Sequence, residues 1–151
     1  MKFGLRALLV ASRVVPPGFE SGVGRPFIAG LGLQVGSCAW PARQVTRLGG
    51  ANFAPFFHPD NKRILFSSNF ENPRSGAFDL YLINVDGTGL KQLTSGEFDD
   101  YEPAYLPDGG IVFVSTRCKR WVNCWMTQVG VMHRCDADGS RIELISPNTE
   151  H

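Results

Sequence analysis

Residues 44–60 read QVTRLGGANFAPFFHPD and residues 92–108 read QLTSGEFDDYEPAYLPD, and the two segments align without a gap. Thr46 and Thr94 each stand thirteen residues before a proline that is followed by aspartate, so the two segments are offset by 48 residues. A sequence that recurs at a fixed period of about 20 to 50 residues is typical of proteins built by stacking copies of one small unit. The chain is therefore predicted to be a repeat protein.

Each copy continues with a short apolar run directly behind the Pro-Asp turn signal. Residues 64–68 (ILFSS) follow one turn and residues 111–115 (IVFVS) follow the other. Proline fixes φ in a turn, and Asp, Asn and Gly accept the left-handed positions after it, so both runs are predicted to be β-strands. Continuous rather than alternating apolarity favours strands that are covered on both faces.

The second half of each copy predicts a hairpin. Residues 79–84 and 129–135 are β-prone, each is followed by an Asp-Gly pair, and residues 90–94 and 141–146 return. Asp-Gly between two β runs is a strong hairpin signal. Each copy therefore reads as four short antiparallel strands, the content of one propeller blade.

The predicted fold class is all-β, a partial β-propeller of about two four-stranded antiparallel blades plus the end of a preceding one. The expected boundaries are listed by residue: a poorly ordered or non-native segment 1–42, a blade end 43–50, a blade 51–96 and a truncated blade 97–151. A closed propeller needs about four to eight blades. The sequence is therefore expected to be a fragment of a longer protein.

The order of motifs resembles a known repeat family. The series Phe-x-Pro-Asp, Ile-x-Phe-x-Ser, Asp-Leu-Tyr-Leu-Ile-Asn and Asp-Gly-Thr-Gly-Leu-x-x-Leu-Thr is similar to the TolB-type, WD-like β-propeller repeat over residues 44–146. The second copy resembles the middle domain of the hydrazine synthase alpha subunit family in the segments Asp99-Asp100-Tyr101-Glu102-Pro103, Val114-Ser115-Thr116-Arg117-Cys118, Cys124-Trp125 and Arg134-Cys135-Asp136. The resemblance implies a propeller fold and a periplasmic or cell-envelope location. It does not imply hydrazine chemistry, because fold and function separate.

Composition narrows the function classes. The net charge is +1, so no basic footprint indicates DNA or RNA as a partner. The sequence contains no window of 18 consecutive apolar residues, so no membrane-spanning helix is predicted. The first eleven residues have the basic-then-apolar order of an export signal, but the apolar run is only five residues before Ser12, where a signal has about 7–15.

The two copies differ most in one loop. The offset is 47 at Phe66 and Phe113 but 52 at Asp86 and Asp138, so residues 116–128 contain five extra positions. Long loops on a rigid scaffold commonly bind partners, and Trp and Arg are enriched at binding hot spots. The predicted binding residues are Arg117, Lys119, Arg120, Trp121 and Trp125. In the alternative, one Trp fills the space between blades and the basic side chains are solvated.

The cysteines allow several readings. Cys118 and Cys124 either close the loop as a disulfide in an oxidising compartment or stay reduced. A metal site would use Cys118, Cys124, His133 and Cys135, but Cys-x5-Cys and His-x-Cys are not usual zinc spacings, so no metal site is expected. Cys-x-x-Cys-His is absent from the sequence, which leaves covalent haem without an attachment point.

No credible catalytic set is present. The acidic run Glu97, Asp99, Asp100 and Glu102 is expected to lie in a solvated loop, because the ligand spacing of a calcium loop is missing. No cofactor is expected, and no Gly-x-Ser-x-Gly elbow occurs. The predicted function is a non-catalytic module for protein–protein interaction or scaffolding. Its partners would be another protein and the remaining blades of a parent chain. The alternative is the structural propeller of a larger enzyme, either a hydrazine synthase alpha-like haem protein or a propeller peptidase.

Overall fold

The computed structural model describes residues 43–71, 77–121 and 127–145, together with three short strands nearer the N-terminus. These residues contain strands and turns but no helix. None of them forms a helix that is long and apolar enough to cross a membrane. The strands are β1 (Ser12–Arg13), β2 (Leu31–Gly32), β3 (Gln34–Val35), β4 (Arg43–Gln44), β5 (Asn52–Phe57), β6 (Arg63–Ser68), β7 (Asp79–Asn84), β8 (Lys91–Gln92), β9 (Asp100–Tyr105), β10 (Ile111–Ser115), β11 (Val131–Cys135) and β12 (Glu143–Leu144).

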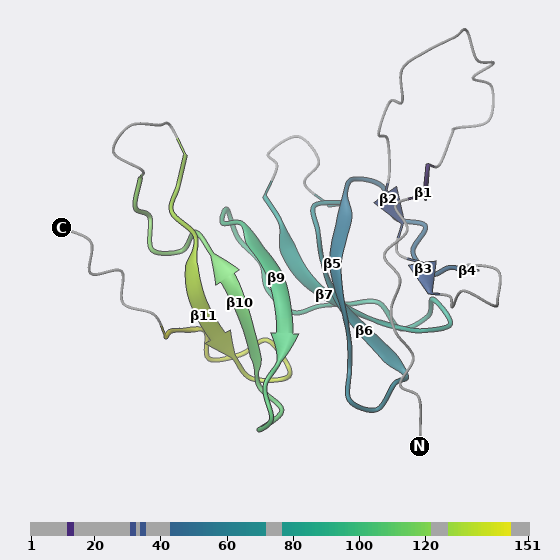
Figure 1. The fold of residues 1–151 in the computed structure, drawn as a ribbon. Helices are drawn as coiled ribbons and strands as arrows, with labels where there is room; N and C mark the ends of the chain where they lie inside the picture. The colour runs from purple at the N-terminus through teal and green to yellow at the C-terminus, as the bar shows by residue number, and fades with distance from the viewer. Residues whose placement is uncertain are drawn as a thin grey trace, which may run out of the picture.

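Two four-stranded sheets make up the body of the protein (Figure 1). The first sheet joins β5, β6, β7 and β8 in chain order, and the second joins β9, β10, β11 and β12. All neighbouring strands are antiparallel, so each sheet is a meander whose connections are local. This confirms the predicted all-β class and four-stranded units. The sheets lie inside the expected blade ranges 51–96 and 97–151.

The first strand of each sheet contains a β-bulge at the same repeat position. The register of β5 with β6 shifts between Phe53 and Phe56, and that of β9 with β10 shifts between Val112 and Val114. Ala54 and Glu102, which are 48 residues apart, have φ values of 50° and 54°. A bulge re-aims the side chains that follow it. The two copies therefore share a local distortion as well as a strand order.

The apolar core forms two layers. One layer lies between residues 45–48 and the first sheet, and its buried members are Val45, Ile64, Phe66, Tyr81 and Ile83. The other layer lies between the two sheets, and its buried members are Leu65, Leu80, Leu82, Leu93, Ile111, Phe113 and Cys135. Ile64 and Phe66 recur as Ile111 and Phe113, so the repeat places the same residue types against the preceding unit. Burying each such side chain stabilises the fold by about 1.5–3 kcal/mol.

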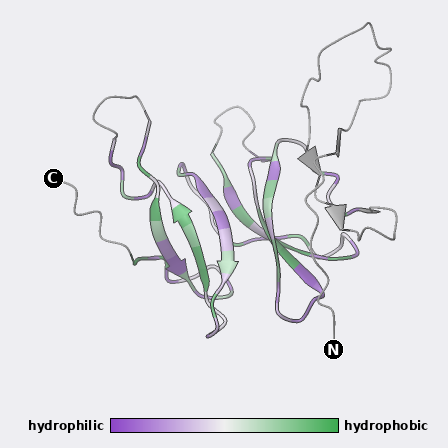
Figure 2. Ribbon diagram, viewed as in Figure 1, coloured by the Kyte–Doolittle hydropathy of each residue, from purple (hydrophilic) through white to green (hydrophobic). Residues whose placement is uncertain are grey.

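The expectation that the middle strands are covered on both faces holds only for the first sheet. β6 is buried from Ile64 to Ser68, whereas burial alternates along β10 and β11. Met132 on β11 is 46% exposed. Hydrophobic residues dominate β10 and recur on β11 in Figure 2. The expectation was wrong for the second sheet, because only one face of it packs against the first sheet.

Two short strand pairs precede the first sheet. β1 pairs with β2, and β3 pairs with β4 next to residues 45–48. The remaining residues of 1–42 lie outside the described part of the chain. The expectation of a poorly ordered or non-native segment there stays a prediction.

Candidate functional site: the 116–128 loop and its anchor

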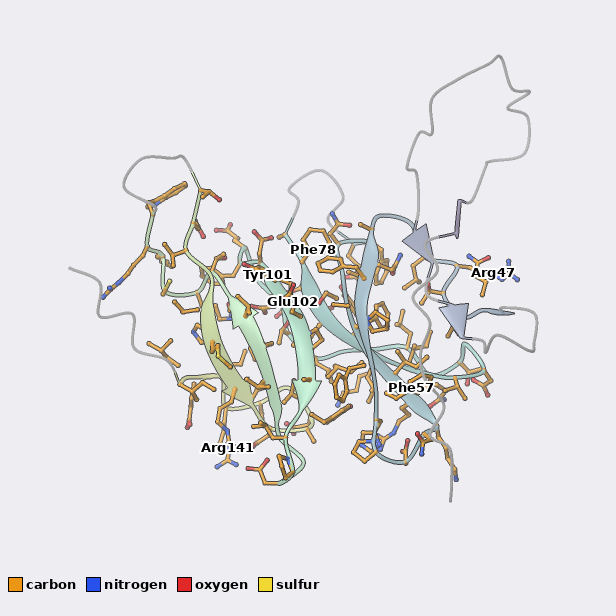
Figure 3. All side chains as sticks on the ribbon, in the orientation of Figure 1. Arg47, Phe57, Phe78, Tyr101, Glu102 and Arg141 are labelled. Atoms are coloured by element: carbon orange, nitrogen blue, oxygen red, sulfur yellow. The ribbon has the colours of Figure 1, made fainter. Side chains whose placement is uncertain are left out.

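The 116–128 loop begins after the last residue of β10, at the end of the second sheet where β9 starts. Figure 3 shows Phe78 and Tyr101 near this end of the two sheets, and Phe57 and Arg141 near the opposite end. Lys119, with φ 52°, turns the chain, and its amide donates to the carbonyl of Thr116 at 3.0 Å. Trp121 forms an antiparallel bridge with Gln128. The base of the loop is therefore closed by an isolated antiparallel bridge.

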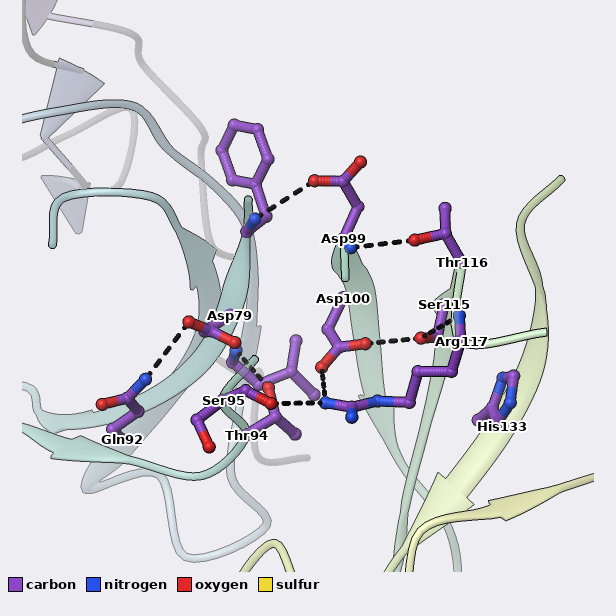
Figure 4. Close-up of polar contacts among 12 residues, drawn as sticks. Asp79, Gln92, Thr94, Ser95, Asp99, Asp100, Ser115, Thr116, Arg117 and His133 are labelled. Atoms are coloured by element: carbon purple, nitrogen blue, oxygen red, sulfur yellow. Dashed lines mark hydrogen bonds and ion pairs between the residues drawn. The ribbon is translucent and has the colours of Figure 1, made fainter. Parts of the chain in front are cut away.

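Arg117 anchors the base of the loop to β9 and to the connection between the two sheets. Its Nη2 lies 2.6 Å from Oδ2 of Asp100 and donates to the carbonyl of Ser95 at 3.1 Å (Figure 4). Asp100 is fully buried, and its Oδ1 accepts the hydroxyl of Ser115 at 2.6 Å. We call Ser95, Asp100, Ser115 and Arg117 the junction network. Arg117 was predicted to face a partner, but its guanidinium is committed to this network.

The solvated loop expected for the acidic run is wrong at Asp100. Its side chain is 0% exposed, and a buried carboxylate requires a partner of opposite charge. Asp99 is also engaged, because its Oδ1 accepts the amide of Phe78 at 3.2 Å. Glu97 and Glu102 are exposed, as expected.

Comparison of the two copies shows which residues make the anchor specific to the second copy. Phe70 and Arg117 occupy equivalent positions, and each donates its amide to the hydroxyl of the serine two residues earlier, at 3.2 Å. In the first copy Phe70 packs on Tyr81, with ring centroids 5.0 Å apart. In the second copy an arginine stands there, and an aspartate, Asp100, replaces Asn52. This paired change within the chain was the sequence signal for the junction network, and inspection of single motifs missed it.

The outward part of the loop carries the remaining predicted residues. Lys119, Arg120 and Trp121 are all exposed, and Trp121 is 58% exposed. The alternative interpretation required one tryptophan to fill the space between the blades, and Trp121 does not do so. Trp125 lies outside the described residues. Phe98 supports the base of the loop, since Arg117 and Lys119 lie 5.1 and 5.4 Å from its ring centroid. Such cation–π contacts hold the positively charged groups of Arg117 and Lys119 near the Phe98 ring at the base of the loop.

The cysteine and histidine candidates are scattered. The thiol of Cys118 donates to the carbonyl of Val129 at 3.2 Å, and its predicted disulfide partner Cys124 lies outside the described residues. His133 is buried, its Nδ1 lies 3.0 Å from the carbonyl of Val131, and its ring stacks on Phe113. Burial, with a smaller contribution from Asp100, raises the pKa of the Cys135 thiol to about 11.

The described residues bring together no group of three or more His, Cys, Asp or Glu side chains suited to a metal ion. Cys135 is a core residue, and the imidazole of His133 contacts a backbone carbonyl and a phenyl ring. His58 lies at the opposite edge, where it contacts Asp60 at 3.0 Å and Arg63 at 2.9 Å. Within the described ranges, neither histidine bonds to a serine, threonine or cysteine side chain, the pairing that activates a nucleophile. The disulfide of Cys118 and Cys124 stays a prediction.

Asp79 is a second buried carboxylate near the junction network. Its Oδ2 accepts from Nε2 of Gln92 at 3.2 Å, while its Oδ1 accepts no hydrogen bond from the described residues. Burial raises the pKa of Asp79 to about 6, the charge of Asp100 adds to the rise, and Arg117 opposes it. The folded protein therefore keeps the proton of Asp79 up to a higher pH than the unfolded chain does.

This raised pKa predicts a pH-dependent stability. The contribution of Asp79 is fully present below its unfolded pKa near 3.8 and is lost as the pH rises through about 6. Between pH 4 and pH 7.5, we expect wild type to lose about 2–3 kcal/mol of unfolding free energy relative to Asp79→Asn. Urea unfolding of both proteins across this range measures the difference. If the unfolding free energy changed with pH by the same amount in both proteins, the prediction would be contradicted.

Asp60→Asn provides a control of opposite sign. The amide of Lys62, then Arg63 and His58, lower the pKa of Asp60, which lies in the exposed turn after β5. Its contribution is present above the unfolded pKa and is lost as the pH falls. Relative to Asp60→Asn, wild type should therefore lose stability on acidification. The effect should be small because Asp60 is solvated.

Comparison with known proteins places the fold. No family model matches the chain. Dipeptidyl-peptidase 5 of Porphyromonas gingivalis is 35% identical over 60 residues, which are 38% of this chain and 9% of that protein. An uncharacterized protein of Agrobacterium fabrum is 32% identical over 73 residues, which are 48% of this chain and 24% of that protein. The chain spans less than a quarter of the length of these curated relatives.

Solved structures resemble the chain over most of its length. TolB of Acinetobacter baumannii aligns with a TM-score of 0.58 and 19% identity over 78% of this chain and 27% of its own. A TolB structure from Agrobacterium tumefaciens aligns with a TM-score of 0.54 and 25% identity over 69% of this chain and 36% of its own. The chain therefore has a TolB-like fold, a partial β-propeller with two four-stranded blades and the end of a preceding one.

Proposed function

We propose that this chain is a non-catalytic propeller module that binds a protein partner through the 116–128 loop. The observation that carries the proposal is that the loop has a buried ion pair at its base and exposed side chains beyond it. Arg117 is held at the junction by buried Asp100, and Lys119, Arg120 and Trp121 point to solvent from the anchored base. An exposed tryptophan with basic neighbours on a rigid base is a typical protein-binding surface.

A capture experiment tests this proposal. The immobilised chain is cross-linked to its partner in an extract of the source cells, and the captured protein is quantified by mass spectrometry. Arg120→Ala with Trp121→Ala should reduce capture at least about tenfold, because truncation of such anchors costs about 2 kcal/mol or more. The matched control is Lys62→Ala with Leu90→Ala, which removes an exposed base and an exposed apolar residue at the opposite edge. Undiminished capture by the loop variant would contradict the proposal.

We further propose that the two blades act within a larger propeller in the periplasm or cell envelope. The chain spans at most 36% of the length of any relative or solved structure described above. This small fraction supports the proposal that the two blades belong to a longer protein. The similarity of the repeat to TolB supports the location. In this arrangement the half-exposed face of β10 and β11 would pack against a further blade.

The second candidate function is the structural propeller of a larger enzyme. The identity shared with dipeptidyl-peptidase 5 favours a peptidase over the hydrazine synthase alpha-like alternative. An isopeptidase structure with a TM-score of 0.51 and 12% identity adds a likeness of fold alone. Sequencing the genomic region beyond His151 separates the candidates. A downstream Gly-x-Ser-x-Gly elbow would favour a peptidase, and Cys-x-x-Cys-His would favour a haem protein.

A further inference from the structure

We propose that the half-exposed face of β10 and β11, the outer face of the second sheet, docks a four-stranded unit of the same repeat. The hairpin of that unit sets a glycine on the backbone of Ile145 and carries a basic side chain beside the glycine. This inference rests on the proposed larger propeller and specifies the chemistry of the blade that covers this face. It follows from a contact between units that occurs twice in the chain.

The recurring contact joins a hairpin glycine to the backbone of the preceding unit. Gly87 lies in the turn between β7 and β8, and a Cβ added to it would lie 2.9 Å from the carbonyl oxygen of Val45. Gly139 lies in the turn between β11 and β12 and approaches the carbonyl oxygen of Leu93 more closely still. Both glycines have a φ of 90°. Val45 and Leu93 occupy the same repeat position, so each hairpin glycine lies on one fixed backbone position of the unit before it.

Ile145 is the next member of this series, 52 residues after Leu93. Its amide donates to the carbonyl of Met132 at 3.0 Å, as the amide of Leu93 donates to that of Leu80 at 2.8 Å. The backbone is therefore held in the same way in both blades. Val45 and Leu93 are 5% and 8% exposed, whereas Ile145 is 42% exposed. Ile145 thus presents the backbone position that receives a glycine in the two earlier contacts.

The side chains around Ile145 suit a further layer of sheet packing. Val112 and Ile145 stand where the first sheet has Leu65 and Leu93, which lie in the core layer between the two sheets. Val112 is only half-buried. Sheets pack face to face through such inward side chains. A unit of the same repeat would cover Val112 and Ile145 as the second sheet covers their equivalents.

The charge beside the glycine contact is reversed in the second blade. Nζ of Lys91 lies 3.5 Å from the carbonyl oxygen of Asp138, next to the incoming hairpin glycine. The repeat equivalent of Lys91 is Glu143, which is exposed. Arg134, the cross-strand neighbour of Glu143, pairs with Asp108 at 3.2 Å. Complementary charge at this position therefore requires a basic side chain, not an aspartate, in the hairpin that docks on Ile145.

The whole chain extended by one blade tests the proposal. Residues 52–96 are repeated after His151, so that residues 147–151 form a linker as long as residues 95–99. The appended blade carries Leu80→Glu and Leu82→Arg, which keep its own outer face soluble. Amide hydrogen exchange of residues 129–145, measured by mass spectrometry, should slow at least about tenfold, because docked strands open less often. Unchanged exchange, or an appended blade that stays unfolded by circular dichroism, overturns the proposal.

Two substitutions in the appended blade test the glycine contact. Gly87→Ala there should remove at least about fivefold of the slowing, because its Cβ would overlap the carbonyl of Ile145. Gly89→Ala is the matched control, since Gly89 has a φ of 66° in the same turn but its Cβ would meet the side chain of Asn84 in its own hairpin. This control should keep most of the slowing. If Gly87→Ala keeps it as well, the larger propeller stands and the glycine contact fails.

Glu143→Lys and Glu143→Gln in the extended chain test the charge. The appended hairpin has an aspartate before its glycine, so Glu143→Lys should slow exchange by a further two- to threefold or about that, and Glu143→Gln by less. Equal exchange in the three chains overturns the basic side chain of the natural partner. Sedimentation velocity of the original chain tests the other occupant of the face. A dimer that Ile145→Lys dissolves would show that a second molecule of this protein covers the face, and would overturn the docking of a further blade.

Discussion

Gly139→Ala is expected to destabilise the protein by about 3 kcal/mol or more. Gly139 has a φ of 90°, which costs an L-residue roughly 1–2 kcal/mol. An added Cβ would also overlap the carbonyl oxygen of Leu93, which belongs to the outer part of the preceding blade. Backbone atoms cannot rotate away as a side chain can, so the two blades would have to separate. Urea unfolding followed by circular dichroism measures the loss.

Gly109 supplies a matched control for this clash. It has a φ of 85°, but an added Cβ would meet no atom within 4 Å, so Gly109→Ala isolates the conformational cost. Gly87, the repeat equivalent of Gly139, would place its Cβ 2.9 Å from the carbonyl oxygen of Val45. The expected order of destabilisation is Gly109, then Gly87, then Gly139. A loss at Gly139 no larger than that at Gly109 would show that the blade contact is looser than the structure has it.

Asp100→Ala is expected to cost about 3–5 kcal/mol of unfolding free energy. The substitution leaves the buried side of Arg117 without its counter-ion and removes the acceptor of the Ser115 hydroxyl. Arg117→Ala should cost a similar amount, because it leaves a fully buried carboxylate uncompensated. The measurement is the urea midpoint and slope of each variant at pH 7.

A double-mutant cycle assigns the effect to the ion pair. Asp100→Ala combined with Arg117→Ala should cost about 1–3 kcal/mol less than the sum of the single losses, since the second change removes an already unpaired charge. The pair of Arg134 and Asp108 is the control, with 3.2 Å between the two groups and Asp108 57% exposed. Asp108→Ala should cost less than about 1 kcal/mol. Additive losses at Asp100 and Arg117 would refute an energetic coupling between them.

Much of the architecture followed from local sequence. The Pro-Asp turns and the Asp-Gly hairpins each depend on residues close together in the chain, whose backbone preferences are strong. The 48-residue period follows from the repetition of these local signals. The slip of the period from 48 to 52 likewise located the 116–128 loop. Local patterns could not predict that Asp100 is buried, because its partner Arg117 lies in the turn after the neighbouring strand β10. In sequence, an acidic run looks the same whether it is solvated or paired.

The sequence by itself determined the repeating four-stranded unit and the place where the two copies diverge, since hydrophobic pattern and turn chemistry act over a few residues. Only the tertiary structure decided the role of each residue in that place. The pairing of β9 with β10 brought Arg117 beside Asp100, and Trp121 was left in solvent. The tertiary structure also distinguishes Gly139 from Gly109. Both glycines follow an aspartate, but of the two only Gly139 faces the backbone of the neighbouring blade. These distinctions depend on contacts between residues far apart in the chain, and the local sequence does not encode which distant residue will lie beside each of them.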